Sequence, residues 1–198
     1  MSIGELNHRV KNTLATVQSL AEQTLKSAAT PSAFAEAFNG RLLALARAHD
    51  LLTRQAWQAI ELDDIAYAVL GGWIEEGRAS VEGSETRITP KQALALAMAF
   101  NELLTNAIKY GALSTPVGKI SLTWACNGTC VVRWSERYGP LVSPPTRRGF
   151  GLRVLNRALA YELGYPVELH FEPEGVTCTI RLDFIADGLS NLIPRQEE

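Results

Sequence analysis

The sequence predicts an α+β protein in which an N-terminal helical hairpin precedes a region of mixed helices and strands. Residues 3 to about 57 carry helical periodicity, whereas beyond residue 60 helical and strand patterns alternate. A chain of 198 residues is long enough for one large or two small domains with a buried core. These observations fix the fold class before any motif is considered.

The helical hairpin is predicted from two apolar patterns separated by a break at "SAATPS". Pro31 and Ser32 lie in this break and are suited to begin a second helix. The first helix carries apolar residues at helical spacing: Ile3, Leu6, Val10, Leu14, Val17, Leu20 and Ala21. The second helix repeats the pattern: Phe34, Phe38, Leu42, Leu45 and Leu52. We therefore expect two antiparallel helices over this part of the chain.

The second region is predicted to contain an apolar helix and two β-hairpins. The helix presents one apolar face between residues 93 and 108. The segment "KISLTWACNGTCVVRWSE" predicts two strands joined at Asn127-Gly128, and "VELHFEPEGVTCTIRLDF" predicts a hairpin turning at Glu174-Gly175. Between the hairpins, "RVLNRALAYELG" is helical, with Gly164 as its C-cap. Residues after about 185 form a polar tail.

Composition excludes several classes of protein. A hydrophobic content of 46% and a charged content of 20% are typical of globular proteins and argue against disorder. The net charge of -2 gives no electrostatic case for a nucleic-acid-binding protein. No run approaches the roughly 18 apolar residues of a membrane span, and the N-terminus lacks a signal-peptide pattern.

The cysteines predict a reducing, cytoplasmic setting. Cys126, Cys130 and Cys178 are odd in number and lack C-x-x-C spacing. The pattern therefore supports neither a zinc site nor a disulfide framework.

His8, in "ELNHRVKN", is the first candidate for chemistry. It points roughly opposite the apolar stripe of the first helix, with Glu5 one turn before it and Asn12 one turn after. An exposed imidazole on a rigid helix suits a phosphoryl acceptor, because the donor must approach the ring nitrogen in line. Glu5 could accept a hydrogen bond from one ring nitrogen and leave the other as nucleophile. From these residues alone, a solvated surface histidine is the favoured interpretation.

The segment "FNELLTNAIKYG" raises the possibility of a nucleotide site. Glu102, Asn106 and Lys109 fall at i, i+4 and i+7, which forms one polar stripe. Such a stripe can be the wet side of any amphipathic helix, or it can bind Mg-nucleotide through the amide oxygen and the ammonium group. Farther on, Gly149 and Gly151 in "RRGFG" directly precede a helix, where a phosphate is favoured. A lone G-x-G is weak, because turns use glycine widely, but the two features together favour a nucleotide site.

Five segments, in order, resemble the motifs of the HWE family of sensor histidine kinases. The resemblance runs from about Glu5 to Phe184. The first two segments resemble that family's phosphoacceptor helix and second bundle helix: "ELNHRVKNTLATVQSLAEQT" and "RLLALARAHDLL". The other three resemble its N-box, its W-x-E element and the glycine box of its ATP lid: "NELLTNAIKYGALS", "RWSERYGP" and "RRGFGLRVL".

The resemblance implies a fold and a division into domains. Residues 1–58 would form a dimerisation and phosphoacceptor hairpin that pairs with a second copy as a four-helix bundle. Residues 59–184 would form an α/β sandwich ATP-binding domain of the GHKL (Bergerat) type, with a mixed sheet under helices. Residues 185–198 would be the polar tail.

The resemblance also implies a reaction. His8 would be phosphorylated by ATP and would pass the phosphoryl group to an aspartate on the receiver domain of a response regulator. Asn12 matches the position of the polar side chain that related kinases use in dephosphorylating the regulator. Because no sensor domain precedes His8 in this sequence, we expect either a fragment of a longer sensor or an input from a partner.

The nucleotide roles that the resemblance implies require ATP and Mg²⁺. Asn106 would hold Mg²⁺ between the phosphates, Lys109 would neutralise phosphate charge, and Glu102 would lie near the metal and assist proton or water positioning. Tyr110 belongs to the same nucleotide-binding segment. Glu136 would accept a hydrogen bond from the adenine amino group. Three glycines would shape the lid over the nucleotide: Gly139, Gly149 and Gly151.

Two positions depart from the family's pattern. Asn101 stands where the family has a histidine in the N-box, and Tyr138 stands where it usually has a glycine before Gly139. We expect Tyr138 to stiffen the entrance to the lid. Two other functions stay open: a histidine phosphotransfer adaptor whose second domain no longer binds ATP, and an anti-sigma kinase that phosphorylates serine without needing His8.

The remaining histidines are interpreted as structural. His49 falls on the apolar stripe of the second helix and is predicted to lie in the bundle core. His170 alternates outward between Leu169 and Phe171 on a strand and is predicted to be a surface residue.

Overall fold

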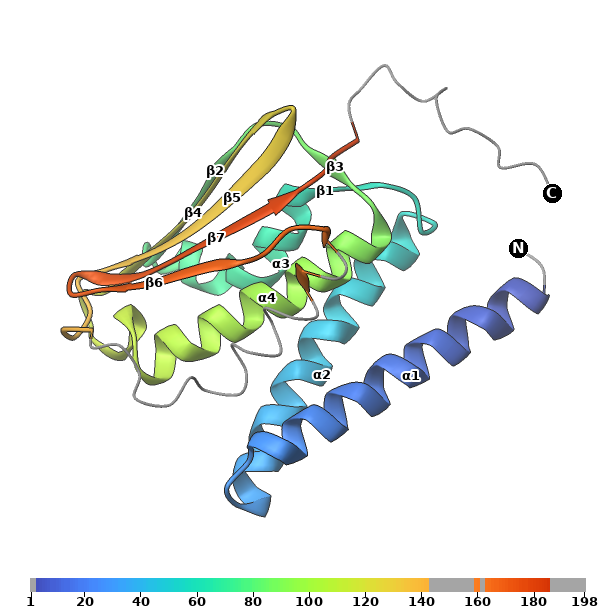
Figure 1. Cartoon of the computed structure of the whole chain (residues 1–198), viewed down its shortest axis with the longest axis horizontal. Coiled ribbons are helices and arrows are strands. Elements are labelled where there is room, and N and C mark those ends of the chain that lie inside the picture. Colours follow the sequence, from blue (N-terminus) through green and yellow to red (C-terminus); the bar gives the residue numbers. More distant parts are fainter. Residues whose placement is uncertain (1–2, 143–158, 161–162, 186–198) are drawn as a thin grey trace.

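The hairpin predicted from the sequence is present as two helices, α1 (Ile3–Ser27) and α2 (Pro31–Arg54) (Figure 1). A computed structural model of the chain describes residues 3–142, 159–160 and 163–185. The break between the helices has a chemical cause, since Oγ1 of Thr30 accepts a hydrogen bond from the amide of Ala33 at 3.1 Å and Pro31 follows as the first helical residue.

Two further α-helices lie in the second region of the chain, one on each side of strands β2 (Ala79–Gly83) and β3 (Arg87–Ile88) in the sequence. These are α3 (Leu62–Glu75) and α4 (Pro90–Lys109), and a short 3₁₀ helix, η1 (Ala112–Ser114), follows α4. A capping box fixes the start of α4, because Thr89 and Gln92 exchange side-chain and backbone hydrogen bonds. The apolar face that the sequence predicted for α4 is largely buried from Ala93 to Ala107, whereas Ile108 at its end is exposed.

The sheet is mixed, as predicted. Its five strands lie in the order β2 (Ala79–Gly83), β4 (Lys119–Asn127), β5 (Thr129–Arg137), β7 (Gly175–Leu182) and β6 (Glu168–Glu172). β2 and β4 are parallel, and the other neighbours are antiparallel. Both predicted hairpins are confirmed, and Gly128 takes a left-handed conformation at the first turn with φ 75°. A separate two-stranded sheet pairs β1 (Ile60–Glu61) with β3 (Arg87–Ile88).

The layers place α4 between the sheet and the hairpin. Helices α3 and α4 lie along the sheet, α2 packs against α4, and α1 contacts α2 (Figure 1). Ala48 and Leu52 of α2 belong to the same hydrophobic core as α4 and the sheet strands. The C-terminal half of α2 is therefore built into the core, and this attachment sets the rest of α2 beside α4.

The apolar stripe of the first helix is only partly covered within one chain. Leu20 is buried, whereas Leu14 is 63% exposed and Leu25 is 68% exposed. On α2, Leu43 is also exposed. The hairpin therefore leaves apolar surface in contact with solvent.

One prediction about the cysteines was wrong. Cys126 and Cys130 face each other across the β4–β5 hairpin and form a disulfide. The prediction failed because it compared the spacing of the two cysteines only with known cysteine motifs. The turn at Asn127-Gly128 places the two cysteines opposite each other on neighbouring strands. Cys178 is a free, buried thiol, and burial raises its pKa to about 12.

The structural interpretations of the other histidines fit their surroundings. His49 is partly buried and its ring meets Trp57 edge to face, with centroids 5.0 Å apart. His170 is exposed on β6, as predicted. The predicted helix at "RVLNRALAYELG" lies largely outside the described residues, although Gly164 has the positive φ of 78° that a C-cap uses. None of the helices in the described part of the chain combines the length and apolar character that a membrane crossing requires.

Candidate functional site

The polar stripe predicted on α4 lies toward α2. Glu102, Asn106 and Lys109 follow one another along a single face of the helix, and none of them is fully buried. Nζ of Lys109 lies 2.7 Å from Oε1 of Glu36 on α2, and both side chains are well exposed to solvent. An ion pair of this kind contributes about 0–1 kcal/mol to stability, so Lys109 can leave it for a phosphate at little cost.

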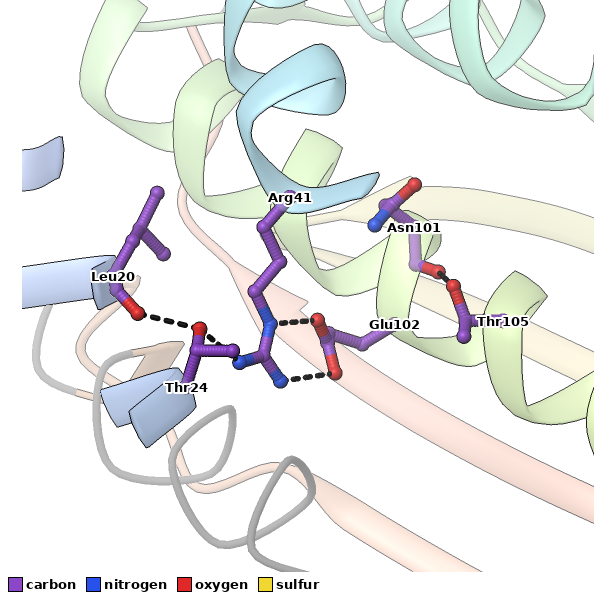
Figure 2. Close-up of polar contacts among 6 residues, drawn as sticks. All are labelled: Leu20, Thr24, Arg41, Asn101, Glu102 and Thr105. Carbon is purple, nitrogen blue, oxygen red and sulfur yellow. Dashed lines mark hydrogen bonds and ion pairs between the residues drawn. The ribbon is translucent and has the colours of Figure 1, made fainter. Parts of the chain in front are cut away.

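Glu102 is held much more firmly than Lys109. Its Oε1 accepts a hydrogen bond from Nε of Arg41 at 2.5 Å, and its Oε2 accepts one from Nη2 at 2.9 Å (Figure 2). This is the parallel, two-bond arrangement in which guanidinium and carboxylate fit best. The side chains are 11% and 13% exposed, so solvent screens the pair little. The hydrogen bonds from Arg41 to Glu102 raise the pKa of the guanidinium, and burial partly opposes them.

Arg41 also contacts α1. Its Nη1 donates a hydrogen bond to Oγ1 of Thr24 at 2.7 Å, and the Thr24 hydroxyl donates to the carbonyl of Leu20 at 2.6 Å (Figure 2). One guanidinium therefore connects the two hairpin helices to the predicted nucleotide helix. The sequence did not identify Arg41 or Thr24, although Arg41 begins the segment that resembles the second bundle helix.

The C-terminal end of α4 meets the end of β5 at Glu136. Along β5 the alternate residues Cys130, Val132 and Trp134 are buried, and Glu136 continues this inward-facing row. Its Oε2 accepts a hydrogen bond from the amide of Ala112 at 2.8 Å, and its Oε1 accepts one from Nε1 of Trp134 at 3.2 Å. Burial raises the pKa of Glu136, while these two hydrogen bonds oppose the rise.

Glycines allow the two chain segments to approach this carboxylate. A Cβ on Gly111 would lie 2.0 Å from Oε2 of Glu136. A Cβ on Gly139 would lie 2.7 Å from the Cα of Ala112. Both distances are far below van der Waals contact, so a side chain at either position would push apart the segment that follows α4 and the end of β5. Gly139 thus has a definite structural role at the base of the segment where the lid was predicted.

The backbone conformation at Tyr138 is one that favours glycine. Its φ is 61°, which is the left-handed region that disfavours side chains. The tyrosine ring is largely exposed, and the backbone carbonyl accepts a hydrogen bond from Oγ1 of Thr115 at 2.9 Å. The turn therefore keeps its geometry in this chain at a conformational cost.

The structure brings some of the predicted site residues together and does not test others. Tyr110 caps α4 and is 75% exposed, and the next two residues, Gly111 and Ala112, lie against Glu136 and Gly139. Glu102 lies farther back along α4, where it pairs with Arg41. Three predicted residues lie on α1, but their side chains are outside what the structure describes: Glu5, His8 and Asn12. Gly149 and Gly151 lie outside the described residues altogether.

Asn106 offers an amide oxygen that could hold a magnesium ion. Mg²⁺ prefers oxygen ligands, keeps several waters and is commonly held by one or two protein oxygens plus substrate phosphates. The described residues contain no cluster of three or more His, Cys, Asp or Glu side chains that could hold a metal by themselves. An amide oxygen on a partly exposed helix face fits a metal that arrives with its nucleotide.

The chain is similar to histidine kinases in sequence. A family model described as HWE histidine kinase matches residues 5–85. A blue-light-activated histidine kinase of Brucella anthropi is 36% identical over 195 residues, covering 95% of this chain and 40% of that protein. A protein of the same name from Brucella ovis is 35% identical over 202 residues, covering 97% of this chain and 41% of that protein. The chain thus spans about two fifths of the length of these curated relatives.

Solved structures share the fold. The Erythrobacter litoralis EL346 blue-light activated histidine kinase superposes with a TM-score of 0.63 at 20% identity, covering 90% of this chain and 57% of that one. The separate histidine kinase domain of the same protein gives a TM-score of 0.60 at 15% identity, covering 83% of this chain and 95% of that one. At these identities the likeness concerns the fold, and it confirms the predicted hairpin followed by an α/β sandwich.

Proposed function

We propose that this chain is a transmitter core of the HWE histidine kinase family, which transfers the γ-phosphoryl group of ATP to His8 and then to an aspartate of a response regulator. The observation that carries the proposal is the arrangement at the C-terminal end of α4. There Gly111 and Ala112, which follow the polar stripe of α4, lie against Glu136 of β5 and Gly139 beyond it, and Ala112 and Glu136 are 24 positions apart in the sequence. The family match supplies the rest of the argument.

ATP would bind along the exposed side of this end of α4. Asn106 would offer its amide oxygen to Mg²⁺, which would neutralise charge on the phosphates when bound. Lys109 would exchange Glu36 for a phosphate oxygen, and its exposed position makes that exchange inexpensive. Tyr110 has a largely free aromatic face beside the same groups.

Glu136 would recognise the adenine amino group. Its two carboxylate oxygens each accept one hydrogen bond from the protein and retain lone-pair capacity for another. Because the contacts to Ala112 and Trp134 already fix the carboxylate, its orientation would be set before the nucleotide binds. Gly139, with Gly149 and Gly151, would shape the lid.

His8 would act as the nucleophile. An imidazole nitrogen must lie in line with the bond to the leaving β-phosphate oxygen, and a rigid helix restricts its motion. Glu5 would hold the other ring nitrogen and fix the tautomer. Asn12 would serve the reverse step, in which a water molecule removes the phosphoryl group from the regulator.

The partners would be a response-regulator receiver domain and a second copy of this chain. The exposed leucines on α1 and α2, Leu14, Leu25 and Leu43, support pairing of two hairpins into a four-helix bundle. The curated relatives are longer than this chain, so a sensory segment would belong to the same signalling protein or to a partner.

A nucleotide titration tests the proposal against the phosphotransfer adaptor. We expect saturable binding of ATP in the presence of Mg²⁺ to the wild-type chain. Asn106→Asp should weaken that binding at least about tenfold, because it places a carboxylate beside the phosphates and removes an amide donor. The matched control, Asn127→Asp, makes the same change at the exposed tip of the β4–β5 hairpin and should bind as the wild type does. Absence of saturable binding at millimolar ATP would favour the adaptor.

A further inference from the structure

We infer that Arg41 is a positioning residue that, through Glu102, holds the nucleotide helix α4 against the hairpin that carries His8. The inference rests on the proposed function, because the alignment of α4 with the hairpin matters only if nucleotide bound near α4 phosphorylates His8. Among the described residues, the side chain of Arg41 donates hydrogen bonds to Glu102 and Thr24 and to neither Asn106 nor Lys109, so its effect would pass through Glu102.

The geometry of the pair is suited to positioning. Two parallel hydrogen bonds, of 2.5 Å and 2.9 Å, fix both the distance and the orientation of guanidinium and carboxylate. A lysine in the same place could satisfy the charge but could not impose the orientation. The low exposure of both side chains distinguishes this contact from the solvent-exposed pair of Lys109 with Glu36 in the same interface.

Thr24 connects the pair to the phosphoacceptor helix. Its buried hydroxyl accepts a hydrogen bond from Nη1 of Arg41 and donates one to the carbonyl of Leu20, one turn earlier on α1. His8 lies on the same continuous helix, Ile3–Ser27. A movement of α1 would therefore displace Arg41 through its hydrogen bond to Thr24, and Arg41 would in turn displace α4 through Glu102.

The arrangement changes the role expected for Glu102. Both of its oxygens accept donors from Arg41, and the charge of the carboxylate is compensated by the guanidinium. A carboxylate with both oxygens engaged by a guanidinium has little capacity left to bind a metal. Glu102 would anchor α4 to the hairpin, while the phosphates would be contacted from Asn106 and Lys109.

The test measures three quantities for each variant: the rate at which His8 is labelled at saturating ATP, the affinity for ATP, and the melting temperature. Arg41→Lys keeps the positive charge but loses the two-bond geometry. We expect it to fold, to bind ATP within about threefold of the wild type, and to be labelled about 10- to 100-fold more slowly, because small misplacements of reacting groups cost that much. Arg47→Gln, at an exposed arginine on the same helix, is the matched control and should be labelled at the wild-type rate.

A charge swap separates positioning from chemistry at Glu102. In the double variant Arg41→Glu with Glu102→Arg, the pair is rebuilt in reverse, and we expect it to recover most of the labelling rate that Glu102→Arg alone loses. Recovery of the melting temperature and ATP affinity without recovery of the rate would show that the Glu102 carboxylate acts in the chemistry, which overturns the inference. An unchanged rate in Arg41→Lys would also overturn it. A wild-type chain that is not labelled at all would instead overturn the proposed function.

Discussion

The backbone amide of Ala112 donates a hydrogen bond to Oε2 of Glu136 at 2.8 Å, and this contact joins η1, which follows α4, to the end of β5. The carboxylate is buried, yet both of its oxygens have donors from the protein. Glu136 therefore affects stability in two ways, through its hydrogen bonds to Ala112 and Trp134 and through the pH-dependent charge of its carboxylate. Its two effects can be measured separately.

The pH dependence of stability should reveal the charge of Glu136. Because burial raises its pKa, the folded state binds the proton more tightly than the unfolded chain does. The stability that this contributes is fully present below the ordinary glutamate pKa of about 4.3 and is lost as pH rises through the raised value. In urea denaturation between pH 4 and pH 7, the free energy of unfolding of the wild type should therefore fall relative to that of Glu136→Gln.

Glu82→Gln, at an exposed glutamate on β2, is the control for this experiment. Its free energy of unfolding should change with pH in the same way as that of the wild type. A difference between the wild type and Glu136→Gln that does not change with pH would contradict the assigned shift. At neutral pH, Glu136→Ala should cost about 1–3 kcal/mol, because two buried donors lose their acceptor.

Gly111→Ala should be destabilising. The added methyl group would lie 2.0 Å from Oε2 of Glu136 and 2.9 Å from the Cα of Ala107, so the carboxylate and the helix end would both have to move. Overpacking of this kind typically costs about 1–3 kcal/mol. Gly40→Ala provides the contrast, because nothing lies within 4 Å of the new methyl group in the interior of α2. It should stabilise the chain by about 0.5–1 kcal/mol, and similar melting temperatures for the two variants would refute the steric argument.

Tyr138→Gly should raise the melting temperature. The φ of 61° costs a tyrosine roughly 1 kcal/mol that a glycine does not incur, and the exposed ring gives up little packing. The hydrogen bond from Thr115 to the backbone carbonyl is retained. A clear loss of stability would mean that the ring makes a compensating contact. Weaker ATP binding in the same variant would support a contact between the ring and the nucleotide.

The sequence predicted the elements with local periodicity and missed contacts between them. The hairpins at Asn127-Gly128 and Glu174-Gly175 follow from turn chemistry and strand alternation, both of which are local. The polar stripe on α4 was likewise visible from spacing. Spacing alone does not say which helix packs against the stripe, so the pairing of Glu102 with Arg41, 61 residues away in sequence, was not predicted.

Two further details were within reach of the same reasoning. The predicted turn at Asn127-Gly128 sets Cys126 opposite Cys130, so the disulfide follows once the cysteines are placed on the hairpin. Period-two alternation places Glu136 on the inner face with Trp134, which predicts a buried carboxylate. Its second partner, Ala112, follows only from the packing of α4 against the sheet.

Labelling of the purified chain with γ-³²P-ATP and Mg²⁺ tests most directly whether His8 accepts the phosphoryl group of ATP. We expect a phosphoprotein whose label is lost in acid and stable in base, as for phosphohistidine. The label should be absent from His8→Gln and unchanged in His170→Gln, which alters an exposed histidine on β6. Label that survives acid, or that persists undiminished in His8→Gln, would contradict the assignment of His8 as the phosphoryl acceptor.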